Sequence, residues 1–197
     1  MQIRKELSAD IPAIHALTLA AFSNATRSGQ PEADLNDRLR DNGHLLLSLV
    51  AELDGAVVGH VAFSPAQIEW AENNGGQPQT GLPSSVPGHA SVVALGPIAV
   101  RPDMQRHGIG SQLILAGFEI LAAQGHNVIF LLGHTTYYPR FGFRPAKPLG
   151  VRWSADQSSD DDPSEHFMVK ELRPNALANL LQGQRGIFHF AKEFDGV

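Results

Sequence analysis

The sequence predicts an α/β fold of mixed α+β character, in which helices flank a mixed β-sheet. Segments with helical periodicity and segments with strand character intermix along the whole chain, and no internal repeat is present. Asp54-Gly55 separates two β-rich apolar runs, which is the strongest short-range signal for a hairpin. Val128–Leu132 is continuously apolar, as is typical of a strand buried on both faces.

The composition indicates one folded domain spanning residues 1–197, and the polar segment at about 71–89 is expected to be an insertion loop. Apolar residues make up 43% of the chain, enough for a sizeable core, and charged residues make up 18%, too few for a disordered chain. The formal net charge of -5 gives no electrostatic reason to expect nucleic acid as a partner, because phosphates require a basic face.

The chain has no cysteine, which excludes a disulfide framework, a thiolate nucleophile and a thiolate metal site. No signal-peptide pattern follows Met1, and the apolar stretches Leu45–Ala51 and Leu113–Ala123 are too short or too interrupted to span a membrane. The histidines show no metal-binding spacing. We therefore expect a cytoplasmic protein without a metal and without a membrane partner.

The first half of the chain predicts two helices and then a hairpin. Ser8 and Asp10 offer N-cap oxygens before Pro12, and apolar side chains at helical spacing predict a helix over roughly residues 9–22. A second helix is predicted over 32–42, and the hairpin joins strands at 45–53 and 56–68. The long polar segment 71–89 is predicted to be a loop, either an exposed insertion or a functional element.

The second half predicts further alternation of strands and helices. In chain order these are a strand at 91–100, a helix at 109–124 ended by Gly125, a strand at 128–132, a short helix or turn at 135–141, an extended piece beginning at Phe143, an acidic loop at 156–163, a strand at 166–172, a short helix at 176–181 and a strand at 187–190.

The run Gln105-Arg106-His107-Gly108-Ile109-Gly110 is a candidate anion site. It lies between a predicted strand and a predicted helix, and a helix N-terminus presents backbone N–H groups that have no intrahelical partner. Glycines there remove the Cβ atoms that would block a phosphate, and Arg106, with Arg101, adds positive charge. The alternative is that both glycines only allow tight packing of the helix on the strand.

Two common nucleotide motifs do not fit this run. A dinucleotide-binding loop requires a third glycine at position 113, where Leu113 stands. A P-loop requires Gly-Lys-Ser or Gly-Lys-Thr, which the chain lacks.

The context of the run resembles the signature of the GNAT superfamily of N-acetyltransferases. Leu95–Pro102 is similar to the hydrophobic strand ending in Val-x-Pro that precedes the family's Gln/Arg-x-x-Gly-x-Gly/Ala motif. Tyr138-Pro139-Arg140-Phe141-Gly142-Phe143 follows the predicted buried strand and is similar to the family's Tyr-x-x-x-Gly-Phe motif. Close likeness covers roughly residues 95–143, and looser likeness reaches back to Ile3. The last fifty or so residues match poorly, so the resemblance implies a variable C-terminal part at about 150–197.

The resemblance implies a GNAT fold with a mostly antiparallel sheet, and acetyl-CoA or a related acyl-CoA in a V-shaped gap between two splayed parallel strands. Gly96-Pro97 gives a physical reason for a break in the first of these strands, because proline removes a ladder donor; an ordinary kink is the alternative. The cofactor-binding residues implied are Ile98, Ala99, Val100, Gln105, Arg106, His107, Gly108, Ile109, Gly110 and Ser111, with Tyr138 and Phe141 packing against the cofactor.

The resemblance further implies direct transfer of the acetyl group to a primary amine in a ternary complex. A backbone N–H near Ile98 is expected to stabilise the thioester oxyanion, and Tyr138 is the candidate general acid, with simple packing against the cofactor as its alternative. The general base is not evident. His134 directly follows the buried strand and is the best candidate, while His60, His89 and Glu69 are poorer ones.

The acceptor is either a small-molecule amine or a protein amino group, and the sequence does not distinguish them. Two other functions stay open: a noncatalytic acyl-CoA-binding or sensing module on the same fold, and an interaction protein that uses the 71–89 loop without a cofactor. A sheet edge near the C-terminus is expected to be available for a homodimer.

Overall fold

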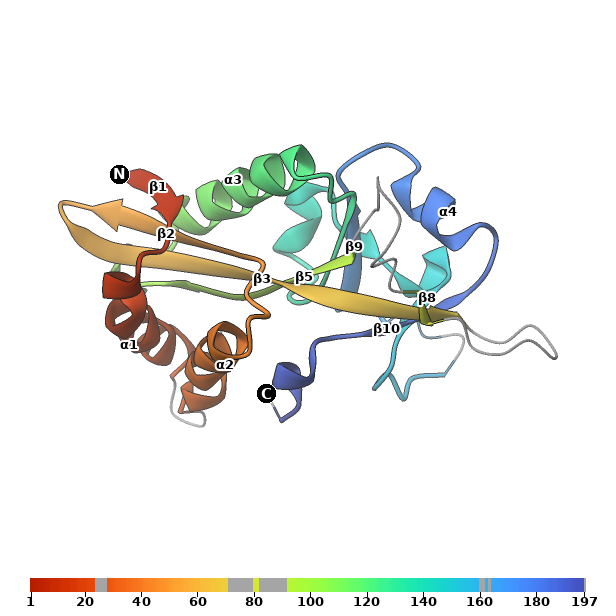
Figure 1. Ribbon diagram of the computed structural model, residues 1–197, viewed down its shortest axis with the longest axis horizontal. Coiled ribbons are helices and arrows are strands. Elements are labelled where there is room, and N and C mark those ends of the chain that lie inside the picture. Colours follow the sequence, from red (N-terminus) through yellow and green to blue (C-terminus); the bar gives the residue numbers. More distant parts are fainter. Residues whose placement is uncertain (24–27, 71–79, 82–91, 160–161, 163, 197) are drawn as a thin grey trace. The chain divides into compact units, whose positions relative to one another are not determined.

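The computed structural model describes residues 1–23, 28–70, 80–81, 92–159, 162 and 164–196 (Figure 1). The chain forms two compact units that interleave in sequence. The first unit contains residues 1–64, 95–120 and 192–197, and the second contains residues 65–94 and 121–191. Two strands, β3 and β5, contribute residues to both units.

The first unit combines the N-terminal strands and helices with the long helix of the chain. Its elements are β1 (Gln2–Lys5), η1 (Ser8–Asp10), α1 (Ile11–Phe22), α2 (Gln30–Asp41), β2 (Leu47–Leu53), the first part of β3 (Ala56–Trp70), the last part of β5 (Val92–Val100), η2 (Pro102–Met104), most of α3 (Ile109–Ala123) and η5 (Lys192–Phe194).

The hairpin predicted at Asp54-Gly55 is confirmed. β2 pairs antiparallel with β3, and β1 pairs antiparallel with the other edge of β2. Asp54 and Gly55 have φ of 51° and 79°, the two consecutive left-handed residues that a type I′ turn requires. This turn matches the right-handed twist of the strands, so the local sequence fixes the register of the pair.

Alternation along β3 directs side chains to two helical layers of the first unit. A Cβ at Gly59 would lie 2.8 Å from a side-chain carbon of Ile109, so this face packs against α3. On the opposite face, fully buried His60 contacts Ser48 of β2. Figure 1 shows α3 on one side of the β2–β3 hairpin and α1 and α2 on the other.

The three predicted helices of this unit are confirmed to within three residues at each end. Pro12 and Pro31 occupy the first turns of α1 and α2, where the missing N–H costs nothing. The C-terminus of α3 is capped by Gly125. Its backbone is left-handed, with φ of 91°, and its N–H donates to the carbonyl of Ala122.

The second unit holds the parallel strand pair and an aromatic core. Its elements are the rest of β3 and β5, β4 (Thr80–Gly81), β6 (Val128–Leu132), η3 (Tyr138–Phe141), β7 (Arg144–Pro145), η4 (Lys147–Leu149), β8 (Val151–Trp153), β9 (Phe167–Glu171), α4 (Ala176–Leu181) and β10 (Gly186–His189). β5 and β6 are parallel, β9 pairs antiparallel with β6 and β7, and β10 joins β3 to β8. The rings of Phe130, Phe167 and Phe188 contact one another in its core, and Phe130 stacks on Phe167.

The predicted class, a mixed and mostly antiparallel sheet with a parallel strand pair and flanking helices, is confirmed, and β8 and β10 form a second parallel pair. The register of β5 with β6 joins residues 92–94 to residues 128–130 and ends at Ala94 and Phe130. β6 and α4 have the predicted bounds.

Four details differ from the predictions. β1 and β8 were not predicted, because each is short and gains its strand character from pairing with a distant segment. The extended piece predicted from Phe143 is only the two-residue β7. Within the predicted loop 71–89, Thr80–Gly81 pairs with β3, and the rest of that loop, with His89, lies outside the described residues.

Candidate functional site

The turn between β5 and α3 contains the predicted anion-binding run. η2 follows the end of β5, and α3 begins at Ile109. Arg106 and Gly108 have left-handed backbone conformations, with φ of 64° and 81°. A Cβ on Gly108 would meet no atom of the described residues within 4 Å, so glycine is required here by the backbone angle and not by crowding.

The first turn of α3 presents backbone donors next to this run. Its first helical hydrogen bond runs from the N–H of Gln112 to the carbonyl of Gly108, over 3.0 Å. The N–H groups of residues 109–111 therefore lack intrahelical acceptors, and the helix dipole adds partial positive charge beside them. Residues 105–108 are exposed, whereas Ile109 is only 3% exposed. The buried Ile109 side chain thus fixes the exposed turn to the core.

The two arginines near the turn differ in their availability. Arg101 donates from Nε to Asp103 Oδ1 over 2.7 Å, so its charge is already paired. Arg106 makes no ion pair with any residue that the structure describes. Arg106 is therefore the cation of this turn that is available to an anion.

In β5, which precedes the turn, Gly96 has a backbone conformation that favours glycine. Gly96 has φ of 143°, which side-chain-bearing residues rarely adopt. Ile98 and Val100 are half-buried, and Ala99 between them is 3% exposed. The predicted oxyanion donor, the N–H of Ile98, lies on this strand in the first unit.

In the second unit, the turn after β6 carries the predicted general acid. The Tyr138 ring packs directly on Gly133, where a Cβ would come within 2.1 Å of Tyr138 Cε2. The edge of Phe143 contacts the same ring, with centroids 5.8 Å apart. Tyr138 is 8% exposed. Only glycine at position 133 lets the ring adopt this position.

The electrostatic state of Tyr138 follows from this burial. Burial, with a smaller contribution from Tyr137, raises the pKa of Tyr138 to about 12. Within the part of the chain that the structure describes, no group hydrogen-bonds to the Tyr138 hydroxyl. The hydroxyl is therefore protonated at neutral pH and its donor is unused.

Two histidines lie beside this turn. His134 is exposed, and its backbone carbonyl accepts bonds from the N–H groups of Tyr137 and Tyr138. His166 was not singled out from the sequence; it lies directly before β9, and its Nδ1 is 3.2 Å from the carbonyl oxygen of Gly133. The pairing of β9 with β6 brings these segments together, which local sequence does not reveal.

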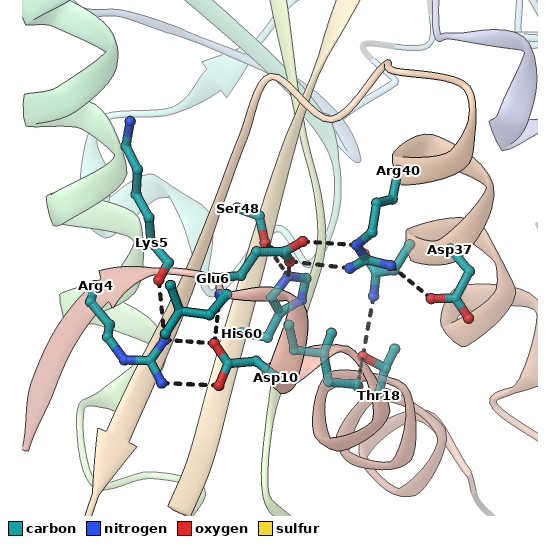
Figure 2. Close-up of polar contacts among 12 residues, drawn as sticks. Arg4, Lys5, Glu6, Asp10, Thr18, Asp37, Arg40, Ser48 and His60 are labelled. Carbon is teal, nitrogen blue, oxygen red and sulfur yellow. Dashed lines mark hydrogen bonds and ion pairs between the residues drawn. The ribbon is translucent and has the colours of Figure 1, made fainter. Parts of the chain in front are cut away.

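A second polar cluster lies in the first unit, between α2 and the β2–β3 hairpin (Figure 2). Arg40 donates from Nε and Nη2 to both carboxylate oxygens of Glu6, at 2.8 and 3.1 Å. Ser48 donates to the same carboxylate, and its Oγ is 2.8 Å from His60 Nε2. Asp37 pairs with Arg40 from its own helix. Sequence reasoning missed this cluster, except that it ranked His60 low as a base.

The pKa shifts of this cluster favour a charged Glu6 and a neutral His60. Burial lowers the pKa of His60 to about 4, against a smaller effect of Glu6. Burial alone would raise the pKa of Glu6, but hydrogen bonds from Arg40 and Ser48 outweigh it and leave that pKa lowered. His60 is thus neutral and fully enclosed at neutral pH, which explains why it is a poor candidate for a base.

Two features are absent from the described residues. No group of three or more histidine, aspartate or glutamate side chains in the described ranges is arranged to hold a metal ion. Among those same residues, no helix is long and apolar enough to cross a membrane.

Comparison with known proteins assigns the family. The profile of the Acetyltransferase (GNAT) family matches residues 11–143, which include both motifs and the hairpin. The chain belongs to the GNAT acetyltransferase family.

Relatives of this GNAT protein match over most of its length. The uncharacterized N-acetyltransferase YhbS of Escherichia coli is 30% identical over 198 residues, which is 99% of each chain. The uncharacterized N-acetyltransferase YjhQ of Escherichia coli is 37% identical over 116 residues, covering 58% of this chain and 56% of YjhQ.

Solved GNAT structures match equally widely. The structure of Escherichia coli YhbS in complex with CoA covers 98% of this chain and 91% of its own, with a TM-score of 0.77 and 29% identity. A GNAT acetyltransferase from Brucella melitensis in complex with acetyl-CoA covers 98% and 97%, with a TM-score of 0.69 and 33% identity.

Proposed function

We propose that this GNAT protein transfers the acetyl group of acetyl-CoA to a primary amine by direct attack. The observation that carries the proposal is the turn at residues 105–111, an exposed set of backbone donors with an available arginine at the start of a helix. Two relatives of known structure, each matching 98% of this chain, are complexes with CoA and with acetyl-CoA, which makes a CoA thioester the ligand to test first.

The residues of the turn fit a pyrophosphate. The N–H groups of residues 109–111 supply donors that have no acceptor among the described residues, and Arg106 supplies charge. Beside Gly108, no atom of the described residues occupies the space that a Cβ would take, which leaves room for a phosphate to approach the backbone. We assign Gln105, His107, Gly110 and Ser111 to the same phosphate site, and Ile98, Ala99 and Val100 to backbone contacts with the pantetheine arm.

Acetyl-CoA supplies an acetyl group activated as a thioester, and the protein supplies groups that act on the developing charges. We assign the N–H of Ile98 to the acyl oxygen, where a preorganised donor lowers the barrier. Tyr138 is assigned as the acid for the departing sulfur, and Phe141 as a packing residue. Because the pKa of Tyr138 is about 12 and that of an ordinary thiol about 8.5, the hydroxyl acts mainly as a hydrogen-bond donor to the developing thiolate.

The absence of cysteine supports direct transfer, because no thiol is available to form an acetyl-enzyme. Small amines and protein amino groups are both compatible acceptors. A homodimer formed through a sheet edge and a cytoplasmic location are further predictions, which light scattering and cell fractionation test.

The proposal is tested by release of free thiol from acetyl-CoA across a panel of primary amines. We expect thiol release with at least one amine, and a fall in kcat of about 100-fold in Tyr138→Phe with little change in KM for acetyl-CoA. Tyr137→Phe is the matched control, because that neighbouring hydroxyl has no assigned role. Full activity of Tyr138→Phe would remove Tyr138 from the reaction, and acetyl-CoA binding without thiol release would instead indicate a sensing module.

A further inference from the structure

Gly133 and His166 form a reciprocal contact that fixes the imidazole ring. The N–H of Gly133 donates to the carbonyl of His166 over 2.9 Å, and His166 Nδ1 lies 3.2 Å from the carbonyl oxygen of Gly133. A backbone carbonyl only accepts, so Nδ1 must be the donor in this bond. In the neutral ring Nε2 therefore carries the lone pair, on an exposed side chain.

The same glycine supports Tyr138. The Tyr138 ring lies on Gly133 so closely that no Cβ fits between them, and the carbonyl of Gly133 holds His166. One residue thus positions a proton donor, the Tyr138 hydroxyl, and a proton acceptor, His166 Nε2. His134 is different, since within the described residues no hydrogen bond to its side chain fixes its ring.

The turn that carries His166 is held in place by a hydrogen bond to Asp156 of the acidic loop. Phe167 N–H donates to the carbonyl of Ser164 over 3.0 Å, which closes the turn around His166. Ser164 Oγ donates to Asp156 Oδ2 over 2.8 Å, and nearly buried Lys147 lies 3.8 Å from the same oxygen. Such an arrangement holds a side chain on a loop in one position, as a catalytic group requires.

We propose that His166 is the general base of the transferase, taking the proton of the attacking amine on Nε2. This inference rests on the function proposed above. As the bond between the amine nitrogen and the acyl carbon forms, the nitrogen gives one proton to Nε2. The carbon–sulfur bond breaks and the Tyr138 hydroxyl donates a hydrogen bond to the departing thiolate. His166 then releases its proton to solvent, and solvent protonates the thiolate.

The titratable and charged groups around His166 come from three segments. Glu165 precedes it on its own turn, and Lys170 follows on β9. His134 and Tyr138 lie on the segment after β6, and Arg144 of β7 is paired with Glu171. These groups are retained in the variants that test His166, so they affect wild type and variant alike.

The test uses His166→Asn, because the asparagine amide can still donate to the Gly133 carbonyl but has no basic nitrogen. We expect kcat for acetyl-CoA and an accepted primary amine to fall about 100-fold or more, and the acid-side limb of the pH profile of kcat/KM to disappear. The melting temperature and its rise with acetyl-CoA should be those of wild type. In His166→Ala, added imidazole should restore part of the activity.

His189→Asn is the matched control, since this histidine of the same unit pairs with Glu69 and should leave the rate and the pH profile unchanged. A wild-type rate and profile in His166→Asn would overturn the inference while the proposed function stands. Loss of the limb in His134→Asn alone would assign the base to His134 instead. No thiol release by wild type with any amine would overturn both proposals together.

Discussion

Gly108 combines a left-handed backbone with open space on the side where a Cβ would stand. Its φ of 81° strains any other residue by about 1 kcal/mol, and a methyl group there would project toward the proposed phosphate position. The single residue therefore has both a conformational and a binding role, and the two are separable by experiment.

Gly108→Ala should abolish most of the rise in melting temperature that acetyl-CoA produces, because the new Cβ obstructs the phosphate. Gly183→Ala is the control, since Gly183 also has φ of 81° and no atom of the described residues within 4 Å of its would-be Cβ. Both variants should lose about 1 kcal/mol of unfolding free energy. An acetyl-CoA shift of wild-type size in Gly108→Ala would remove the turn from the binding site.

At the residue scale, the sequence shows which glycines matter but not what each one contacts. The motif places Gly108 and Gly110 correctly at the start of a helix. It gives no sign that Gly133 supports Tyr138, or that Gly133 holds His166 from 33 positions away. Contacts of that separation depend on strand pairing, which no local pattern encodes.

Among the elements, the Glu6–Arg40 ion pair joins α2 to the segment between β1 and η1. This ion pair is bidentate, and its side chains are only 15% and 17% exposed. Removing the arginine leaves a partly buried carboxylate without its main partner, which is more costly than losing an exposed pair.

Arg40→Met should therefore lower the free energy of unfolding by about 2–3 kcal/mol, measured by urea denaturation at pH 7. Arg144→Met is the control, because the Arg144–Glu171 pair has a similar distance, 2.7 Å, but its arginine is 54% exposed. That control should lose less than about 1 kcal/mol. Equal losses in the two variants would contradict the structural role of the Glu6 cluster.

Elements with strong local signals were predictable. Asp54-Gly55 fixes its hairpin, and the apolar run of β6 stands out with the correct bounds. β1 contains three polar residues and β8 only three residues in all, so neither has a pattern that distinguishes it from a loop. Each becomes a strand because a partner far along the chain offers an edge.

For the whole molecule, the buried His60 makes stability depend on pH. Its pKa is about 4 in the folded protein and 6.5 in a solvated chain, so the unfolded state takes up the proton first as the pH falls. The contribution of His60 is complete above pH 6.5 and lost progressively down to about pH 4. The lowered pKa of Glu6 acts in the same direction at still lower pH.

The free energy of unfolding should therefore fall by roughly 3 kcal/mol between pH 7 and pH 4 on account of His60 alone. His60→Gln keeps a donor near the position of Nε2 but does not titrate, so its decline over this range should be shallower. Urea denaturation of both proteins at several pH values measures the difference. Parallel curves for the two proteins would show that His60 does not cause the dependence.

Transfer of an acetyl group from acetyl-CoA to an amine is the proposed function of the whole molecule. The most direct measurement is mass spectrometry of the amine panel after incubation with acetyl-CoA, combined with quantification of the CoA thiol. We predict that one mole of N-acetylated amine appears for each mole of CoA released. Release of CoA without an acetylated amine, or no release with any amine, would contradict the account.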